Sequence, residues 1–170
     1  MERPVRPDRI YFGRTEPMEH AQSPLVGTCR CGRTAIEVRL PPIMVSACHC
    51  RGCQRMSASA YSLTAMIPSE GFAVMTGEPV RGGARSPEIS HYFCDDCKSW
   101  MYTELGMMPG IVNVRPTMFD NDAWTRPFIE TMTAEKLAWA TTPARYSYPG
   151  FPPLEDYERL LGEFADAWRG

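Results

Sequence analysis

Hydrophobic and polar residues alternate along the segment 34–40. Ile36, Val38 and Leu40 share one side of an extended chain, and the charged residues between them share the other. A period of two is typical of a β-strand with one buried face. Short apolar segments of similar length follow, and the sequence predicts further strands at 43–48, 60–67, 72–76, 88–94, 99–105, 110–115 and 126–132.

Turn-forming residues separate several of these predicted strands. They occur at Ser69-Glu70-Gly71, Gly77-Glu78-Pro79, Gly82-Gly83 and Pro109-Gly110. Short strands spaced about ten residues apart favour an antiparallel sandwich or an open barrel over alternating βαβ units. We therefore expect a mainly β fold.

The C-terminal segment has a helical period. Apolar residues recur there at steps of three and four, at Leu154, Tyr157, Leu160, Leu161, Phe164, Ala165 and Trp168. This pattern predicts a helix that begins after Pro152-Pro153. We expect its apolar stripe to dock on the sheet, and the alternative is a contact in a homodimer. The chain then divides into a polar, proline-rich N-terminal arm (1–24), a β domain (25–153) and this helix (154–170).

Length and charge narrow the class of protein. The 170 residues favour one domain, and 18 basic against 20 acidic residues give a net charge of -2. A general nucleic-acid binder would need a basic surplus to displace counterions from phosphates, so we expect no nucleic-acid partner. The chain has neither the ~18 consecutive apolar residues of a membrane span nor the apolar run of a signal peptide. We expect a cytoplasmic protein without a membrane partner.

Seven cysteines carry the chemical information in this sequence. An odd number cannot be satisfied by disulfide pairing alone, and a reducing compartment would oppose such pairing. Buried structural cysteines, the alternative, would be scattered along core strands as small hydrophobic residues. Instead all seven lie in three short groups, which favours metal binding: Cys29 and Cys31; Cys48, Cys50 and Cys53; and Cys94 and Cys97.

Zinc prefers tetrahedral sulfur and nitrogen ligands, and short spacings between cysteines bring two thiolates together. In a strand, residues two apart point to the same face, so Cys29 with Cys31 and Cys48 with Cys50 can each present a pair. Four cysteines make a closed structural site, whereas three leave one position open. Seven cysteines thus suggest one zinc that builds the fold and one that accepts an outside ligand. Spacing alone leaves open which four belong together.

The three groups resemble motifs of the glutathione-dependent formaldehyde-activating enzyme family, also called the centromere protein V domain family. The resemblance extends from about Gly27 to Pro153 and includes all seven cysteines. It implies a β-tent, a fold of twisted, mostly antiparallel sheets. It also implies two zinc ions per chain: a structural zinc on Cys29, Cys31, Cys94 and Cys97, and a second zinc on Cys48, Cys50 and Cys53, where the family binds the glutathione thiol.

This resemblance implies a carbon–sulfur lyase, or adduct-forming protein, that acts on glutathione or a similar thiol and on formaldehyde or a related small aldehyde. Zinc deprotonates a coordinated thiol, and the thiolate would add to the aldehyde to give S-hydroxymethylglutathione. Cys48, Cys50 and Cys53 then hold the catalytic metal. Arg51 and Arg55 lie beside this site and could meet the carboxylates of the thiol substrate, or could be solvated surface residues.

The sequence departs from the family pattern at Lys98, where members usually carry glycine. A residue that follows such a turn often needs a positive φ, which costs lysine about 1–2 kcal/mol. Either the turn is rearranged, or metal binding, worth roughly 10 kcal/mol or more, absorbs the strain. The magnitudes favour the second explanation.

For other residues near the cysteines, the sequence favours a structural role over a functional one. Strand alternation turns His49 away from the metal and favours packing or hydrogen bonding over general-base catalysis. His91 is expected in the core or at the surface, and not as a ligand. Tyr61 and Trp139 are candidates for lining a pocket, although aromatic residues in a small β domain usually belong to the core.

Two further hypotheses compete with the lyase. The first is a zinc-stabilised module that binds a thiol or a protein without turnover, because a fold does not determine its function. The second is a metallochaperone or zinc store. The complete three-cysteine group favours thiol chemistry, since a purely structural module could lose it freely.

Overall fold

The computed structural model describes residues 24–83, 86–120 and 122–169. The predicted N-terminal arm lies outside these residues except for Pro24. The strands are β1 (Leu25–Thr28), β2 (Ala35–Val38), β3 (Met44–Cys48), β4 (Ser62–Pro68), β5 (Phe72–Thr76), β6 (Val80–Gly82), β7 (Ile89–Phe93), β8 (Trp100–Leu105), β9 (Ile111–Val114), β10 (Ile129–Thr131) and β11 (Tyr146–Ser147). The α-helices are α1 (Arg51–Ser57) and α2 (Tyr157–Arg169), and short 3-10 turns span Ser69–Gly71, Pro116–Met118, Asp122–Thr125, Thr133–Glu135 and Leu154–Asp156.

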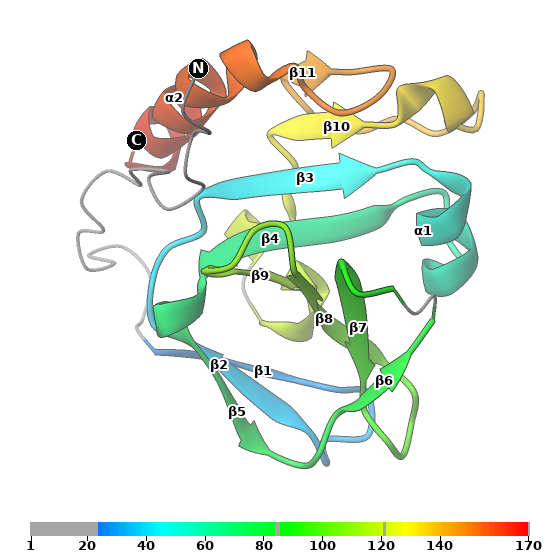
Figure 1. Ribbon diagram of the computed structural model, residues 1–170, viewed down its shortest axis with the longest axis vertical. Helices are drawn as coiled ribbons and strands as arrows, with labels where there is room; N and C mark the ends of the chain where they lie inside the picture. Colours follow the sequence, from blue (N-terminus) through cyan, green and yellow to red (C-terminus); the bar gives the residue numbers. More distant parts are fainter. Residues whose placement is uncertain (1–23, 84–85, 121, 170) are drawn as a thin grey trace, which may run out of the picture.

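The strands form two sheets, as Figure 1 shows. The larger sheet has eight strands in the order β11-β10-β3-β4-β9-β8-β7-β6, and the smaller has the order β1-β2-β5. In Figure 1 the smaller sheet lies below β3 and β4, while α1 follows the C-terminal end of β3. The expected mainly β fold with a C-terminal helix is confirmed.

The sheets are mostly antiparallel, as expected, and parallel pairing occurs at one edge of the larger sheet. Strand β10 runs parallel to both neighbours, with Ile129 opposite Ser46 in β3 and opposite Tyr146 in β11. Parallel pairing needs a long crossover connection, and the chain supplies one between β9 and β10 and another between β10 and β11. The parallel pairing of β10 with β3 places Thr131 opposite Cys48, the first cysteine of the second group.

Alternating residues of the large sheet build the hydrophobic core. Val45 and Ala47 of β3 and Ala65 and Ile67 of β4 are all fully buried. The pattern of one apolar residue in two, from which the strands were predicted, places these side chains on one face. Ile36 and Val38 of the small sheet belong to the same core cluster, together with Val112, Val114, Phe119 and Trp124.

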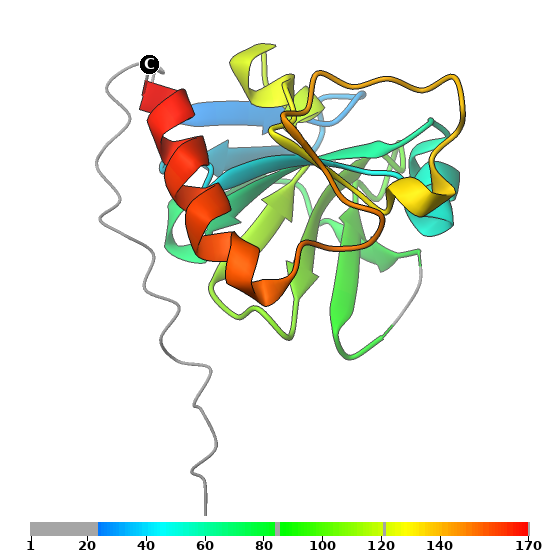
Figure 2. The same ribbon diagram turned by 90° about the horizontal axis from the view of Figure 1, so that it is seen from above.

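Helix α2 covers an edge of the core, and Figure 2 shows it lying along one side of the molecule. Leu160 and Phe164 are buried, and Phe164 packs against Phe128 with ring centroids 5.5 Å apart. The predicted docking of the apolar stripe is therefore observed. Leu154 is an exception: it lies in the 3-10 turn that precedes α2 and is 88% exposed. A homodimer contact stays a prediction.

The sequence analysis did not identify four elements. Strands β1, β6 and β11 have two to four residues each and show too little alternation to detect. Helix α1 has seven residues, none of them buried, so it has no apolar stripe. Within the described ranges, no helix is long and apolar enough to cross a membrane. The division into domains stays a prediction.

Candidate metal centres

Two hairpin turns bring four cysteines together from distant parts of the chain. Cys29 and Cys31 lie in the turn between β1 and β2, and Cys94 and Cys97 lie in the turn between β7 and β8. The four sulfur atoms all lie within 4.8 Å of one another. We call these residues the four-cysteine cluster.

Both turns are closed by an equivalent backbone hydrogen bond. The backbone N–H of Cys29 donates to the carbonyl of Thr34 at 3.0 Å, and that of Cys94 donates to the carbonyl of Ser99 at 3.0 Å. Cys29 and Cys31 therefore share a turn, and the expectation that strand alternation pairs them is wrong. Such a turn brings the sulfur atoms of its two cysteines close together.

The geometry of the four-cysteine cluster fits zinc. The sulfur of Cys31 lies 3.5 Å from that of Cys29 and 3.8 Å from that of Cys94. A tetrahedral ion with zinc–sulfur bonds of about 2.3 Å requires sulfur atoms about 3.8 Å apart. The residues thus match the metal in number, chemical type and spacing.

Polar contacts stabilise the ionised form of Cys97 and join the two turns of this cluster. The hydroxyl of Ser99 lies 3.2 Å from the sulfur of Cys97 and lowers the pKa of that thiol to about 5. Arg33 of the first turn forms an ion pair with Asp96 of the second. The backbone N–H of Arg30 donates to the hydroxyl of Ser99 at 3.3 Å.

The departure at Lys98 has a clear structural form. Lys98 adopts φ 58° in the second turn, where Gly32 adopts φ 74° in the first. The turn is therefore not rearranged to suit lysine, and the residue carries the left-handed strain that glycine would avoid. Its ammonium group donates to the carboxylate of Asp95 at 2.7 Å, across the exposed side of the turn.

The second group, Cys48, Cys50 and Cys53, forms the three-cysteine cluster. Their sulfur atoms also lie within 4.8 Å of one another, and all three residues are half-buried. Cys48 ends β3, Cys50 caps the N-terminus of α1, and Cys53 lies within that helix. The sulfur of Cys50 accepts the N–H of Cys53 at 3.3 Å. A strand end followed by a helix start, and not a continuous strand, therefore brings Cys48 and Cys50 together.

The thiols of this cluster differ in acidity. A hydrogen bond from the thiol of Cys53 lowers the pKa of Cys48 to about 5, and the same contact raises the pKa of Cys53. Of these two thiols, Cys48 is therefore the one that ionises first in the absence of a metal. Three sulfur ligands leave one position of a tetrahedral ion for an outside group.

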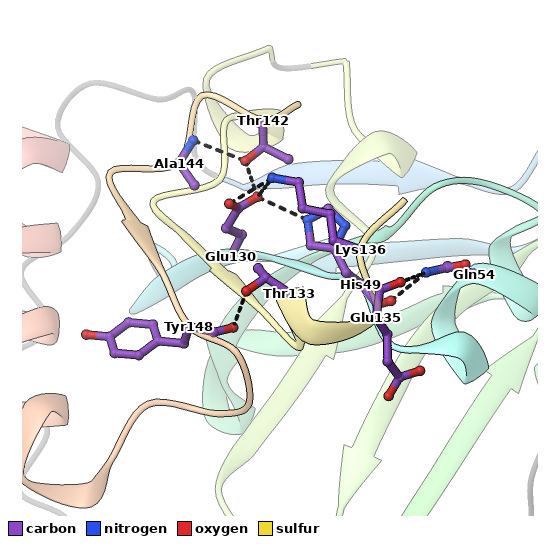
Figure 3. A network of polar contacts seen from close by, with 9 residues as sticks. All are labelled: His49, Gln54, Glu130, Thr133, Glu135, Lys136, Thr142, Ala144 and Tyr148. Atoms are coloured by element: carbon purple, nitrogen blue, oxygen red, sulfur yellow. Dashed lines mark hydrogen bonds and ion pairs between the residues drawn. The ribbon is translucent and has the colours of Figure 1, made fainter. Parts of the chain in front are cut away.

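His49 lies between two of these cysteines and points away from them, as predicted. Its side chain is fully buried, and its Nε2 lies 3.1 Å from a carboxylate oxygen of Glu130. Glu130 also accepts from the ammonium of Lys136 and from the hydroxyl of Thr142, at 2.8 Å and 2.7 Å (Figure 3). This contact links the residue between Cys48 and Cys50 to β10, and a structural role for His49 stays a prediction.

A second set of contacts in Figure 3 fixes the start of α1. The amide of Gln54 donates to the carbonyl of His49 at 2.6 Å and to that of Glu135 at 3.0 Å. The carboxylate of Glu135 accepts the N–H of Arg51 at 2.7 Å. Strand β10 and the loop after it thus hold the histidine and the helix that position the three sulfur atoms.

The other predicted neighbours have varied surroundings. Arg51 and Arg55 lie on α1 with exposed side chains, and Arg51 donates to the side-chain oxygen of Gln54 at 3.0 Å. His91 is half-buried, with Nδ1 2.9 Å from the hydroxyl of Thr103, and belongs to neither cluster. Trp139 is 74% exposed. No contact among the described residues shows how either arginine meets a ligand.

Sequence analysis missed three charged residues of this region. Glu130 and Lys136 form the buried network described above. Arg115 follows β9 and is only 6% exposed. The signal for Glu130 was its position within a predicted apolar strand, where a charge needs a partner. Arg115 gave a weaker signal, because it was the last residue of the predicted strand 110–115 and preceded a proline, a position where a charged side chain usually faces solvent.

Two comparisons with known proteins find a similarity. A family model described as glutathione-dependent formaldehyde-activating enzyme matches residues 24–135, a segment that contains both clusters. The crystal structure of a Rhodobacter sphaeroides protein is similar to this chain at 22% identity and a TM-score of 0.49, covering 57% of this chain and 89% of that one. No match is found among curated proteins.

Proposed function

The chain belongs to the glutathione-dependent formaldehyde-activating enzyme family, and on this basis we propose that it is a zinc-dependent carbon–sulfur lyase or adduct-forming protein. Its substrates would be glutathione or a similar thiol and formaldehyde or a related small aldehyde. The observation that carries the proposal is the division of seven cysteines into one group of four and one of three. A closed site suits a structural metal, whereas an open site suits a metal that binds an outside ligand.

The four-cysteine cluster supports a structural role. It joins the turn before β2 to the turn before β8, and these turns belong to different sheets. All four positions of a tetrahedral ion would be filled by the protein, so an outside ligand could not enter. We assign Cys29, Cys31, Cys94 and Cys97 to a zinc that holds the two sheets together.

The three-cysteine cluster supports the chemical role. Zinc bound there would supply the positive charge that keeps an outside thiol ionised at neutral pH. Cys48, Cys50 and Cys53 hold the metal, and the contacts of His49 with Glu130 and of Gln54 with Glu135 keep these cysteines in place. Arg51 and Arg55 flank the cluster on the exposed side of α1, where the carboxylates of a glutathione-like thiol could bind.

The cysteine chemistry also supports a cytoplasmic location. All seven cysteines are free thiols in the structure. A reducing compartment preserves such thiols for metal binding, whereas an oxidising one promotes disulfides.

The proposal is tested by the exchange between formaldehyde and its glutathione adduct. Carbon-13 exchange spectroscopy would measure this rate with and without the zinc-loaded protein, at a pH where the uncatalysed reaction is slow. We expect acceleration by the wild-type chain and none by Cys53→Ser. If the wild-type chain binds glutathione at the metal but does not accelerate exchange, it is a thiol-binding module without turnover.

A further inference from the structure

Arg115 is a buried arginine whose hydrogen-bonding capacity is largely unused. The residue is 6% exposed, and its Nε and Nη1 atoms are buried without a hydrogen-bond partner. Its remaining nitrogen, Nη2, donates to the carbonyl of Asn113 at 3.2 Å. Three of the five N–H groups of the guanidinium, one on Nε and two on Nη1, are therefore available to a ligand.

The guanidinium is held in a fixed position by an aromatic ring. It lies over the indole of Trp100, with its central carbon 4.1 Å from the ring centroid. The indole N–H donates in turn to the hydroxyl of Thr103 at 3.2 Å. Stacking uses the flat face of a guanidinium, so the N–H groups in its plane remain free.

The register of the large sheet places Arg115 near the three-cysteine cluster. Cys48 lies opposite Ser62 across β3 and β4. Two residues further along β4, Thr64 comes level with Arg115, because Ala65 pairs with Val114. Paired residues share a face and so do residues two apart, so Cys48, Ser62, Thr64 and Arg115 lie on one face of the sheet. Ser62 and Thr64 are both buried.

Electrostatics agree with this placement. Burial lowers the pKa of Arg115 to about 10, and the nearby thiols of Cys53 and Cys48 act in the opposite direction. A buried charge without a partner is costly, so a protein that keeps one needs a compensating anion. Among the described residues, no carboxylate makes a hydrogen bond or ion pair with this guanidinium.

We propose that the guanidinium of Arg115 receives the oxygen atom of the aldehyde at the three-cysteine cluster and stabilises the negative charge that develops on it. This assignment rests on the proposed function and adds a catalytic residue to it. The site suits a one-carbon or similarly small aldehyde, because Arg115 is buried beneath the sheet surface. The exposed Arg51 and Arg55 suit the larger thiol partner.

The reaction balances without any further reagent. The thiol first loses its proton to solvent, and its sulfur then forms a bond to the carbonyl carbon. The π pair of the carbonyl bond moves to oxygen, which faces the N–H groups of Arg115. This alkoxide takes a proton from solvent to give the hydroxymethyl thioether, and the reverse sequence cleaves the carbon–sulfur bond. Arg115 donates hydrogen bonds throughout and transfers no proton.

The first test uses formate, a one-carbon carboxylate that places a charged oxygen where the aldehyde oxygen would lie. The arginine Nε–H signals of the zinc-loaded wild-type chain are assigned through bonds by NMR and followed during a formate titration. We expect the Arg115 Nε–H signal to shift and saturate, while that of the exposed Arg126 does not change. If the Arg115 signal does not move, the proposal is wrong.

The second test uses variants and measures three quantities for each: zinc content, glutathione affinity and the rate of adduct exchange. In Arg115→Gln we expect unchanged zinc content and affinity and a rate about 100-fold lower, the usual effect of losing an oxyanion donor. Arg115→Lys should recover part of that rate. Arg126→Gln serves as the control for removing an arginine charge.

These measurements separate failure of this proposal from failure of the proposed function. If the wild-type chain neither binds glutathione nor accelerates exchange, the proposed function is wrong, while the formate titration still decides whether Arg115 is an anion site. If exchange is accelerated equally by wild-type and Arg115→Gln, the function stands and Arg115 has no catalytic role. An equal loss of affinity and rate in Arg115→Gln would make Arg115 a thiol-binding residue and overturn the assignment.

Discussion

The sulfur atoms of Cys31 and Cys94 lie 3.8 Å apart, although 63 residues separate them in the chain. Such a contact closes a long loop, and the entropic cost of closure rises only logarithmically with loop length. A metal shared by the two turns would supply much more free energy than this closure costs. The fold and the four-cysteine cluster therefore depend on each other.

The first prediction concerns metal content. A chain purified without chelator should contain close to two zinc ions, because each cluster brings together three or four of the sulfur ligands that zinc prefers. Elemental analysis against protein concentration measures this ratio. A value of one or less would contradict the division into two sites, and a predominance of iron would contradict the choice of metal.

The two clusters should respond differently to the loss of one ligand. Cys94→Ser removes a buried ligand of the cluster that joins the two sheets, and we expect an unfolded or aggregated chain. Cys53→Ser removes a half-buried ligand beside α1, and we expect a folded chain that has lost one zinc and its thiol binding. Circular dichroism and elemental analysis of both variants provide the test. Equally native spectra would refute the assigned roles.

The strained turn at Lys98 gives a prediction on stability. Lys98→Gly should raise the free energy of unfolding by about 1 kcal/mol relative to Lys98→Ala, because glycine tolerates the observed φ of 58° and alanine does not. Both variants lose the exposed contact with Asp95, so their difference isolates the backbone term. Urea unfolding of the zinc-loaded variants measures it, and alanine proving equal to glycine would argue against strain at this position.

The buried network around Glu130 should make stability depend on pH. Burial raises the pKa of Glu130, but hydrogen bonds from Lys136 and Thr142 outweigh it and lower the value to about 2, from 4.5 for a free side chain. The carboxylate therefore stabilises the fold fully above about pH 4.5, and this contribution is lost as the pH falls towards 2. At neutral pH, Glu130→Gln should lower the free energy of unfolding by about 3 kcal/mol, since it leaves half-buried Lys136 and fully buried His49 without their carboxylate partner.

Urea unfolding of wild type and Glu130→Gln over a series of pH values tests this account. The difference between the two proteins should be largest at neutral pH and should shrink below pH 4.5. Loss of metal in acid affects both proteins and cancels in the difference. Glu158→Gln, which changes an exposed carboxylate of α2, is the matched control. A difference that did not depend on pH would show that ionisation of Glu130 is not its cause.

Local patterns predicted most of the fold. Alternation from Ile36 to Leu40 and the stripe from Leu160 to Trp168 each reflect one face packed on the core, which a sequence records directly. Strand β10 was located, but its parallel pairing with β3 was not predicted, since that pairing depends on a crossover with no local signature. The short helix α1 lacks a buried face and left no pattern to detect.

The candidate site was predicted in part for the same reason. Cysteines are rare and chemically distinct, so their grouping predicted metal sites, and the family resemblance assigned them to a group of four and a group of three. The partners of His49 could not be predicted, because Glu130 follows it by 81 residues and meets it only through the crossover. The register of β3, β4 and β9, which only the structure shows, places Arg115 on the same face of the sheet as Cys48.

The open position of the three-cysteine cluster is the central claim, and it makes a spectroscopic prediction. Three thiolates around a divalent ion carry a net charge of -1, and an outside thiolate would raise it to -2. Arg51 and Arg55 are exposed cations beside the cluster, so replacing both with glutamine should weaken thiol binding and leave the metal in place. The double variant thus reports on the approach of the thiol and not on the metal itself.

The most direct measurement titrates a cobalt-substituted chain with glutathione and, as the matched control, with S-methylglutathione, which has no thiol to ionise. We predict that glutathione intensifies the sulfur-to-metal charge-transfer absorption and that S-methylglutathione leaves it unchanged. The same spectrum with both compounds would show that the thiol does not reach the metal, and it would contradict the account even if both zinc ions were present.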